Sequence, residues 1–348
     1  MSKKDSSVLK LRLKDLSLNN KTSLIYSNFK SQLITSIKKN SFLVAVSGGP
    51  DSLALSALSH TYSIEKKIKV FFVLVDHGIR ANSYSEAQSV KNLFKKKKID
   101  LIILRNKKKI SKNIQSHARE IRYQLLLNFS KKNKIKFIMT GHHRDDQIET
   151  FLIRLSRGSG IQGLSSMSKV SNLSNTTKLF RPLLDEKKEN LIFLAKYYFG
   201  KIFKDPSNTN QKYLRTKIRN LIKRFEKSGI KLDRIINSIN NLASTRDTLN
   251  FYIERTEKNC VIKKVNTISI NLKKFFLEND EIQLKIFSNC IKKISKNYYP
   301  PRAKKVLNLI SRVRSNKSSK ATLGGCVIIR SKKNLIISKE ELKKPIKL

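Results

Sequence analysis

Short apolar runs alternate with longer segments of helical spacing up to about residue 200 of the chain. Each run has the length of a buried strand, and the four runs span residues 42–46, 70–76, 101–104 and 137–140. The segments between them repeat apolar residues at helical intervals, at about 53–62, 84–97 and 113–133, and a further helix starts near Asp145. Strands that alternate with helices are typical of a parallel sheet covered on both faces, so the pattern predicts an α/β fold.

The strand alternation stops beyond about residue 200. Helical spacing dominates residues 211–258 and 279–313, and Tyr299-Pro300-Pro301 breaks the chain before the last helical segment. The tail carries two short β-like runs, at 326–329 and 335–337. The later part of the chain therefore reads as mostly helical, with a small α+β module near 320–340.

These changes of pattern predict three parts of the chain, without an internal repeat. We expect a basic N-terminal extension over residues 1–20, a parallel-sheet domain over 21–225, and a C-terminal region over 226–348. At 348 residues the chain is long enough for two domains with cores of their own.

Polar clusters follow three of the four predicted strands. They are Ser47–Ser52 after the first strand, Asp76–Arg80 after the second and Gly141–Asp146 after the fourth. Ligands of a parallel α/β sheet bind beyond the carboxyl ends of its strands. We therefore expect all three clusters to meet at one edge of the sheet.

The first cluster, SGGPDS, has the residue types of an anion-binding turn. Gly48 and Gly49 can adopt backbone angles closed to other residues and leave their N–H groups uncovered. Pro50 suits the first helical turn, and Ser47 and Ser52 place hydroxyl groups beside a helix N-terminus that favours negative charge. The alternative is a plain strand-to-helix turn with glycines at convenient positions.

Asp51 within this turn changes the prediction. A carboxylate beside a phosphate is repulsive unless a cation lies between them, so Asp51 implies Mg²⁺. The Walker pattern is absent, because no lysine follows the glycines. The turn is therefore expected to bind phosphate without being an ordinary NTPase loop.

The other two clusters have alternative interpretations that the residues leave open. Asp76 and His77 suit a nucleotide pocket, to which Gly141 would also belong, but Asp76 could equally cap the turn at Gly78. His142 and His143 are sequence neighbours that point in different directions, and no third histidine or cysteine completes a zinc set.

A magnesium or acid–base role is therefore more plausible than zinc for the carboxylates of Asp145 and Asp146. Gln147, Glu149 and Thr150 carry the same polar character into the helix, where they could also form a solvated face.

Composition adds a class of partner. With 74 Lys and Arg against 25 Asp and Glu, the formal charge is +49, which favours a polyanion such as nucleic acid, although part of the charge could reflect a general bias towards lysine. The three cysteines are Cys260, Cys290 and Cys326, too far apart for a CxxC pair, which indicates a reducing cytoplasm. No segment reads as a signal peptide or approaches the roughly 20 apolar residues of a membrane span, so we expect a soluble protein without a membrane partner.

Seven motifs then occur in one order along the chain. They are SGGPDS at 47–52, VDHGIR at 75–80, ARxxRY at 118–123, TGHHRDDQIET at 140–150, RxxRGSGxxGLxxM at 154–167, RPLL at 181–184 and DPSN at 205–208. Together they resemble the tRNA(Ile)-lysidine synthase family, a group of N-type ATP pyrophosphatases that carry a PP-loop. The resemblance covers roughly residues 25–225, and beyond these only LGGC at 323–326 is similar.

The resemblance implies an ATP-dependent ligase. Its substrates would be free lysine and an isoleucine tRNA with a CAU anticodon, and its products lysidine, AMP and diphosphate. The implied catalytic residues are Asp51, Asp145, Asp146 and His143, with Asp51 holding Mg²⁺. The nucleotide would contact Ser47, Gly48, Gly49, Pro50, Asp51, Ser52, Asp76, His77 and Gly141. The tRNA and lysine would contact Arg119, Arg122, Arg154, Arg157, Gly158, Asp205, Asn208 and Arg215.

Two other functions fit part of this pattern. Another PP-loop enzyme, such as a tRNA cytidine thiolase, would typically use CxxC clusters, which this chain lacks. A basic RNA-binding protein that has lost catalysis predicts substitutions in the SGGPDS turn, which is intact. The sequence leaves open whether the chain acts alone or as a homodimer.

Overall fold

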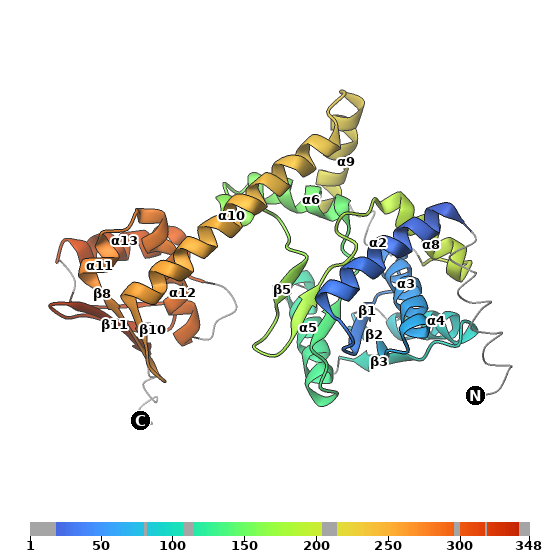
Figure 1. Ribbon diagram of the computed structural model, residues 1–348, viewed down its shortest axis with the longest axis horizontal. Helices are drawn as coiled ribbons and strands as arrows, with labels where there is room; N and C mark the ends of the chain where they lie inside the picture. The colour runs from blue at the N-terminus through green and yellow to red at the C-terminus, as the bar shows by residue number, and fades with distance from the viewer. Residues whose placement is uncertain are drawn as a thin grey trace. The chain divides into compact units, whose positions relative to one another are not determined.

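The computed structural model describes residues 19–79, 82–106, 114–203, 214–295, 300–316 and 319–340 (Figure 1). Its internal contacts divide the chain into two compact units, Met1–Ala243 and Ser244–Leu348. The division falls within one long helix, α10 (Leu232–Cys260). The domain limits expected at residues 20 and 225 stay predictions.

A six-stranded sheet forms the centre of the first unit. Its strands are β1 (Phe42–Val46), β2 (Val70–Asp76), β3 (Leu101–Arg105), β4 (Phe137–Met139), β5 (Val170–Asn172) and β6 (Lys178–Phe180). They lie in the order β3-β2-β1-β4-β6-β5, and all neighbours are parallel except β5 and β6. The predicted parallel α/β sheet is confirmed, and β1 and β2 have the predicted bounds.

Helices cover both faces of this sheet. The covering helices are α2 (Asn20–Ser36), α3 (Pro50–Lys66), α4 (Ser83–Lys96), α5 (Ile114–Lys132) and α8 (Lys188–Phe199). The other helices before α10 are α6 (Arg144–Leu155), α7 (Ile161–Leu164) and α9 (Leu214–Lys227), of which α7 and α9 pack against α6. Phe42, Val44 and Val46 of β1 share a core with α2, α3, α4 and α8, whereas Leu43 packs with α5 on the other face. The alternating side chains of one strand thus serve two cores.

The helix α2 was not predicted from the pattern of the chain. Ile25, Phe29 and Leu33 are buried at four-residue intervals, which gives the helix one apolar stripe. The side chain of Asn19 caps its start by accepting a hydrogen bond from the Lys21 amide at 2.9 Å. The Glu65 carboxylate of α3 then accepts a hydrogen bond from the Tyr26 hydroxyl at 2.6 Å.

In the part that the structure describes, the second unit contains the C-terminal half of α10, a five-stranded antiparallel sheet and three further helices. The strands are β7 (Val261–Lys263), β8 (Thr267–Asn271), β9 (Lys320–Leu323), β10 (Cys326–Arg330) and β11 (Asn334–Lys339), in the order β7-β8-β11-β10-β9. The helices are α11 (Leu272–Phe276), α12 (Asp280–Ser295) and α13 (Ala303–Arg314). The expected small α+β module is confirmed, and β7 and β8 extend it beyond the prediction.

The segment at 211–258, where helical spacing was expected to dominate, forms two helices. Helix α9 ends at Lys227, and α10 begins at Leu232. Gly229 between them has a φ of +86°, a left-handed conformation that glycine adopts without steric cost. Among the described residues, no helix is both long enough and apolar enough to span a membrane.

Candidate active site

The SGGPDS turn joins β1 to α3 and needs its first glycine for two reasons. Gly48 has a φ of +81°, and a Cβ at this position would lie 2.8 Å from Cγ2 of Val90. Gly49 then caps α3 in an extended conformation, and Pro50 occupies the first helical position. Backbone N–H groups of the first helical turn lack acceptors within the helix, so the turn offers them to an anion.

The two serine hydroxyls of the turn bond inside it. The Ser52 hydroxyl donates to the Gly49 carbonyl oxygen at 3.0 Å and accepts from the amide and the hydroxyl of Ser47, each at 3.1 Å. Ser52 is buried. These hydroxyls therefore shape the turn, and the anion-binding donors that remain are the backbone amides.

Gly141 brings the turn after β4 against the turn after β1. A Cβ at Gly141 would lie 2.7 Å from the Asp51 carbonyl oxygen and 3.1 Å from the Ser52 amide nitrogen. Real Cβ atoms do not approach backbone atoms so closely, so the packing requires glycine at this place. Two of the three predicted clusters thus meet at one sheet edge, as expected from strands β1 and β4 being parallel neighbours.

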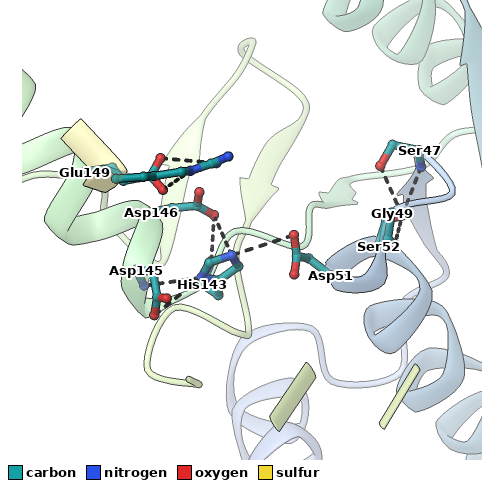
Figure 2. A network of polar contacts seen from close by, with 9 residues as sticks. Ser47, Gly49, Asp51, Ser52, His143, Asp145, Asp146 and Glu149 are labelled. Carbon is teal, nitrogen blue, oxygen red and sulfur yellow. Dashed lines mark hydrogen bonds and ion pairs between the residues drawn. The ribbon is translucent and has the colours of Figure 1, made fainter. Parts of the chain in front are cut away.

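His143 lies buried between carboxylates of both turns (Figure 2). It caps α6: its Nδ1 accepts a hydrogen bond from the Asp145 amide at 3.2 Å, and its own amide donates to Asp146 Oδ2 at 3.1 Å. Its Nε2 lies 3.6 Å from Asp51 Oδ2 and 3.5 Å from Asp146 Oδ2. Because Nδ1 accepts a hydrogen bond, the proton of the neutral ring is on Nε2, where it faces these two carboxylates.

The network favours the charged forms of His143 and Asp146. Burial disfavours protonation of His143, but the bond to Asp51 and the charge of Asp146 outweigh it and hold the pKa of His143 above its ordinary value. Burial likewise disfavours ionisation of Asp146, yet the charge of His143 and the bond from the His143 amide lower the pKa of Asp146. Asp146 is therefore an anion at neutral pH.

Asp51 has a carboxylate oxygen suited to a hard cation. Its Oδ1 is buried and has no hydrogen-bond partner. Within the described ranges, no group of three or more His, Cys, Asp or Glu side chains is arranged to hold a metal ion. Mg²⁺ is commonly bound by one or two carboxylates together with substrate phosphates, so a lone carboxylate beside an anion-binding turn fits this ion.

The cluster after β2 shows the turn-capping contacts that the sequence left open. The Gly78 amide donates to Asp76 Oδ1 at 2.9 Å, and Arg105 Nε lies 3.8 Å from Asp76 Oδ2. The Asn106 amide group donates to the His77 carbonyl oxygen at 3.2 Å. Burial, and then the charge of Arg122, lower the pKa of His77. Asp76 therefore caps its turn, while its predicted nucleotide contact stays a prediction.

Three arginines form a cationic cluster, and none of them makes an ion pair with a carboxylate among the described residues. Arg119 and Arg122 of α5 lie 5.0 and 5.6 Å from the ring centre of Tyr123, and Arg215 of α9 is near Arg122. Burial, together with the like charges of Arg119 and Arg215, lowers the pKa of Arg122. A half-buried cation with like-charged neighbours favours an anion at this place.

The expected substrate contacts from the RGSG segment separate into two groups. Arg154 turns towards the chain, where one terminal nitrogen donates to the carbonyl oxygens of Gly163 at 2.7 Å and Ser166 at 2.9 Å. Arg157 and Gly158 are exposed at the tip of the segment. Asp205 and Asn208, like Arg80 and Tyr213, lie outside the described residues.

The sequence interpretation missed the burial of Glu149. A solvated helical face was one expectation for Glu149, but it is 2% exposed, and its Oε1 lies 2.5 Å from Arg219 Nε (Figure 2). Glu149 follows Asp146 by three residues, so both lie on one face of α6. No signal in the sequence marks Arg219 as its partner, because 70 residues separate them.

His142 is a second residue that the sequence left without a role. Its Nδ1 lies 2.8 Å from the Thr140 hydroxyl oxygen. Burial outweighs the charge of Asp146 and, with the charge of Arg181, lowers the pKa of His142 to about 3. His142 is therefore neutral beside the arginine cluster.

The three cysteines belong to the second unit. Cys260, Cys290 and Cys326 are buried in the core of the second unit. Burial raises the pKa of all three thiols, that of Cys260 to about 11. The thiols are therefore protonated at neutral pH, and none belongs to the first unit.

Comparisons with known proteins agree with this geometry. The PP-loop domain model matches residues 22–225. The tRNA(Ile)-lysidine synthase of Wolbachia pipientis wMel is 36% identical over 306 residues, which cover 86% of this chain and 71% of that protein. The protein of the same name from Rickettsia typhi is 30% identical over 330 residues, which cover 92% and 75%.

Solved structures support the fold alone. A U34-tRNA thiolase, NcsA from Methanococcus maripaludis with its 4Fe-4S cluster, has a TM-score of 0.54 at 20% identity, over 64% of this chain and 80% of that one. The thiolase alternative is therefore similar in fold, whereas the three cysteines of this chain are buried in the apolar core of the second unit. The family model and the relatives together show that the chain belongs to the tRNA(Ile)-lysidine synthases, a family of PP-loop enzymes.

Proposed function

We propose that this protein converts the wobble cytidine of an isoleucine tRNA with a CAU anticodon into lysidine. It joins the side-chain amine of free lysine to C2 of the cytidine and uses ATP, which leaves as AMP and diphosphate. The observation that carries the proposal is the network that joins Asp51 of the phosphate-binding turn to His143 and Asp146 of the next turn. One edge of the sheet can thereby hold ATP and a second substrate together.

The first step activates the cytidine. The C2 oxygen attacks the α-phosphorus of ATP, a P–O bond forms, and the bond to the β-phosphate breaks with release of diphosphate. The amides of Gly48 and Gly49 and the N-terminus of α3 stabilise the negative charge that builds on the departing group. Asp51 would hold Mg²⁺, which supplies further charge neutralisation for the phosphates.

The second step transfers lysine. The lysine amine attacks C2, the C–N bond forms, and AMP leaves with the former C2 oxygen. The amine has a pKa of about 10.4 in water, so it must lose a proton before it attacks. That proton passes to the network of Asp145, Asp146 and His143, whose carboxylates also attract the lysine ammonium group.

The cationic cluster of Arg119, Arg122 and Arg215 supports an anion contact beside this network. The planar guanidinium group suits the two oxygens of a carboxylate or a phosphate. We assign this cluster to the lysine carboxylate or the adjoining tRNA phosphate. The buried Glu149–Arg219 pair extends the polar site along the same face of α6.

Exposed cations of α9 and α13 suit the tRNA body. Lys217 and Arg215 are exposed on α9, and Lys304, Lys305 and Arg312 are exposed on α13. Phosphate contacts give affinity without reading sequence, which fits helices rich in exposed lysine and arginine. The reaction needs ATP, lysine and tRNA together, so we place it in the cytoplasm. The homodimer stays an open expectation.

The proposal is tested by incubating the protein with ATP, labelled lysine and an unmodified isoleucine tRNA that carries the CAU anticodon. We expect labelled tRNA, with AMP and diphosphate formed in equal amounts. The same transcript with uridine in place of the wobble cytidine is the matched control and should remain unlabelled. Absence of both label and diphosphate from the cytidine-bearing tRNA would contradict the proposal.

A further inference from the structure

Helix α6 carries polar side chains on two different faces. Asp146 and Glu149, three residues apart, share the face of the proposed chemistry, as Figure 2 shows. Gln147 and Arg154 are seven residues apart, two helical turns, and therefore share another face. This second face holds the segment that follows the helix.

Gln147 binds the backbone of Met167 through both ends of its amide. Its Nε2 donates to the Met167 carbonyl oxygen at 2.9 Å, and its Oε1 accepts from the Met167 amide at 2.8 Å. A paired donor and acceptor of this kind copies the contact between two strands. Only 9% of Gln147 is exposed, so its two bonds face little competition from water.

Two further contacts fix the neighbouring residue in an unfavourable conformation. Ser166 has a φ of +56°, in the left-handed region that residues with a Cβ rarely adopt. Its hydroxyl donates to the Gln147 carbonyl oxygen at 3.0 Å, and its own carbonyl oxygen accepts from Arg154 at 2.9 Å. A strained residue persists where its surroundings determine its conformation, and such residues concentrate at functional sites.

The segment that is held in this way presents an open tip. Arg157, Gly158 and Gly160 are exposed, and a Cβ at either glycine would meet no atom within 4 Å. At Gly160, where φ is −76°, neither strain nor crowding within the chain requires glycine. A bare backbone beside an exposed arginine leaves room for a large anion to approach closely.

We propose that Gln147 and Arg154 are positioning residues that lock the segment 156–167 onto α6, so that Arg157 at its tip meets the tRNA backbone. The inference rests on the proposed function for the identity of the RNA. It assigns Arg154 to the inside of the protein rather than to direct contact with substrate. Gln147 acts through Arg157 and touches no reacting atom.

The test measures tRNA affinity in the full chain. Gln147→Leu keeps the side-chain volume but removes both amide bonds, and we expect the Kd for the isoleucine tRNA to rise about tenfold, the cost of one charge-assisted contact. The KM for ATP, which depends on the turn after β1, should change less than about twofold. Gln283→Leu is the matched control, because Gln283 is also buried and donates to a backbone oxygen, that of Glu278, at 2.5 Å. It should leave the tRNA Kd unchanged.

A double-mutant cycle separates positioning from a general loss of stability. Arg157→Met should weaken tRNA binding about tenfold in the wild-type background and less than about twofold in the Gln147→Leu background. If the two losses multiply, Gln147 does not act through Arg157 and the inference fails. Arg154→Lys, which keeps a donor for the two carbonyl oxygens, should retain more affinity than Arg154→Met.

Hydrogen exchange gives a readout that is independent of RNA and of activity. In Gln147→Leu the peptide over residues 163–168 should exchange about tenfold faster or more, while peptides from β1 and α3 keep their protection. Unchanged exchange in that peptide would show that Gln147 does not hold the segment 156–167, and the inference would fail. If the wild-type protein forms no lysidine but the Gln147→Leu variant shows the faster exchange, the proposed function fails. The inference that Gln147 holds the segment 156–167 is then still supported.

Discussion

The two units differ in the kind of polar side chain that they bury. In the first unit, Asp76, His143, Glu149 and Arg181 are charged or ionisable side chains that are buried. In the described part of the second unit, the buried polar side chains are Thr256, Gln283 and Ser288, which carry no charge. Burial of charge is costly unless partners compensate for it, so a fold accepts it where the charge has a use. The comparison marks the first unit as the place of the chemistry.

The same contrast holds for reactive groups. The first unit orders carboxylates, two histidines and a cationic cluster at one sheet edge, whereas the second unit encloses its three thiols in an apolar core. Burial raises the pKa of those thiols and makes them poor nucleophiles and poor metal ligands. Similar degrees of burial thus produce a reactive site in one unit and inert packing in the other.

The substitution with the largest expected effect removes the charge of the phosphate-binding turn. Asp51→Asn should lower the rate of diphosphate release about a thousandfold, because the phosphates lose the charge compensation that Asp51 brings. Binding of tRNA, measured by filter retention, should stay within about threefold of the wild type, since phosphate contacts elsewhere dominate RNA affinity. A comparable loss of tRNA binding would show that the metal role is misplaced.

A smaller but still large effect is expected from adding a methyl group at the contact between the turn after β1 and the turn after β4. Gly141→Ala places a Cβ where the Asp51 carbonyl oxygen lies 2.7 Å away, so the turns must move apart. We expect about a hundredfold loss of diphosphate release and a loss of about 1–3 kcal/mol in the free energy of unfolding. Urea denaturation and a pyrophosphate assay measure the two quantities.

Gly160→Ala is the control for that experiment, because its Cβ would meet open space at an ordinary φ. It should leave the free energy of unfolding within about 0.5 kcal/mol of the wild type. Equal effects of the two alanines would contradict the close packing of the turns.

Removing the half-buried guanidinium of Arg122 should lower activity without lowering stability. Arg122→Met should lower kcat/KM for lysine about tenfold or more, because a substrate anion loses a charge-assisted contact. The free energy of unfolding should stay equal or rise, since burial and like charges disfavour this guanidinium in the folded protein. Thermal unfolding and lysine titration of the reaction test both parts, and a strongly destabilised but fully active variant would disprove them.

The smallest effect on activity is expected in the second unit. Cys290→Ala removes a buried sulfur from an apolar core and should cost about 1–2 kcal/mol of unfolding free energy through the cavity it leaves. The rate of diphosphate release by folded protein should be unchanged. Iodoacetamide should likewise fail to inhibit the native enzyme at neutral pH, because the buried thiols stay protonated. Rapid inactivation by iodoacetamide would contradict the claim that the thiols of the second unit are unreactive.

The strands of the parallel sheet could be read from the sequence because each is a continuous apolar run. Strands β1 and β2 have the expected bounds, and β3 and β4 differ by one residue at their ends. The three-residue strands β5 and β6 escaped prediction, since so short a segment has no period of its own.

The parts of the site divide in the same way. The residue types of Gly48 and Pro50 were enough to predict the turn between β1 and α3. The burial of Glu149, by contrast, depends on Arg219 in another helix, and the inward course of Arg154 depends on two carbonyl oxygens beyond its own helix. Glycine is needed at position 141 because the Asp51 backbone packs against it. The residues next to Gly141 in the sequence do not reveal this contact.

By itself the sequence determined which strands are followed by polar turns, the residue types of the SGGPDS turn and the positive charge, because each of these is local or additive along the chain. Only the tertiary structure decided which charges are buried, which are neutralised and which remain available, because desolvation and pairing depend on groups that meet from distant segments. Arg154 and Arg157 illustrate the result. Two arginines three residues apart in one motif are separated by the fold into one that bonds backbone carbonyl oxygens and one whose side chain is exposed.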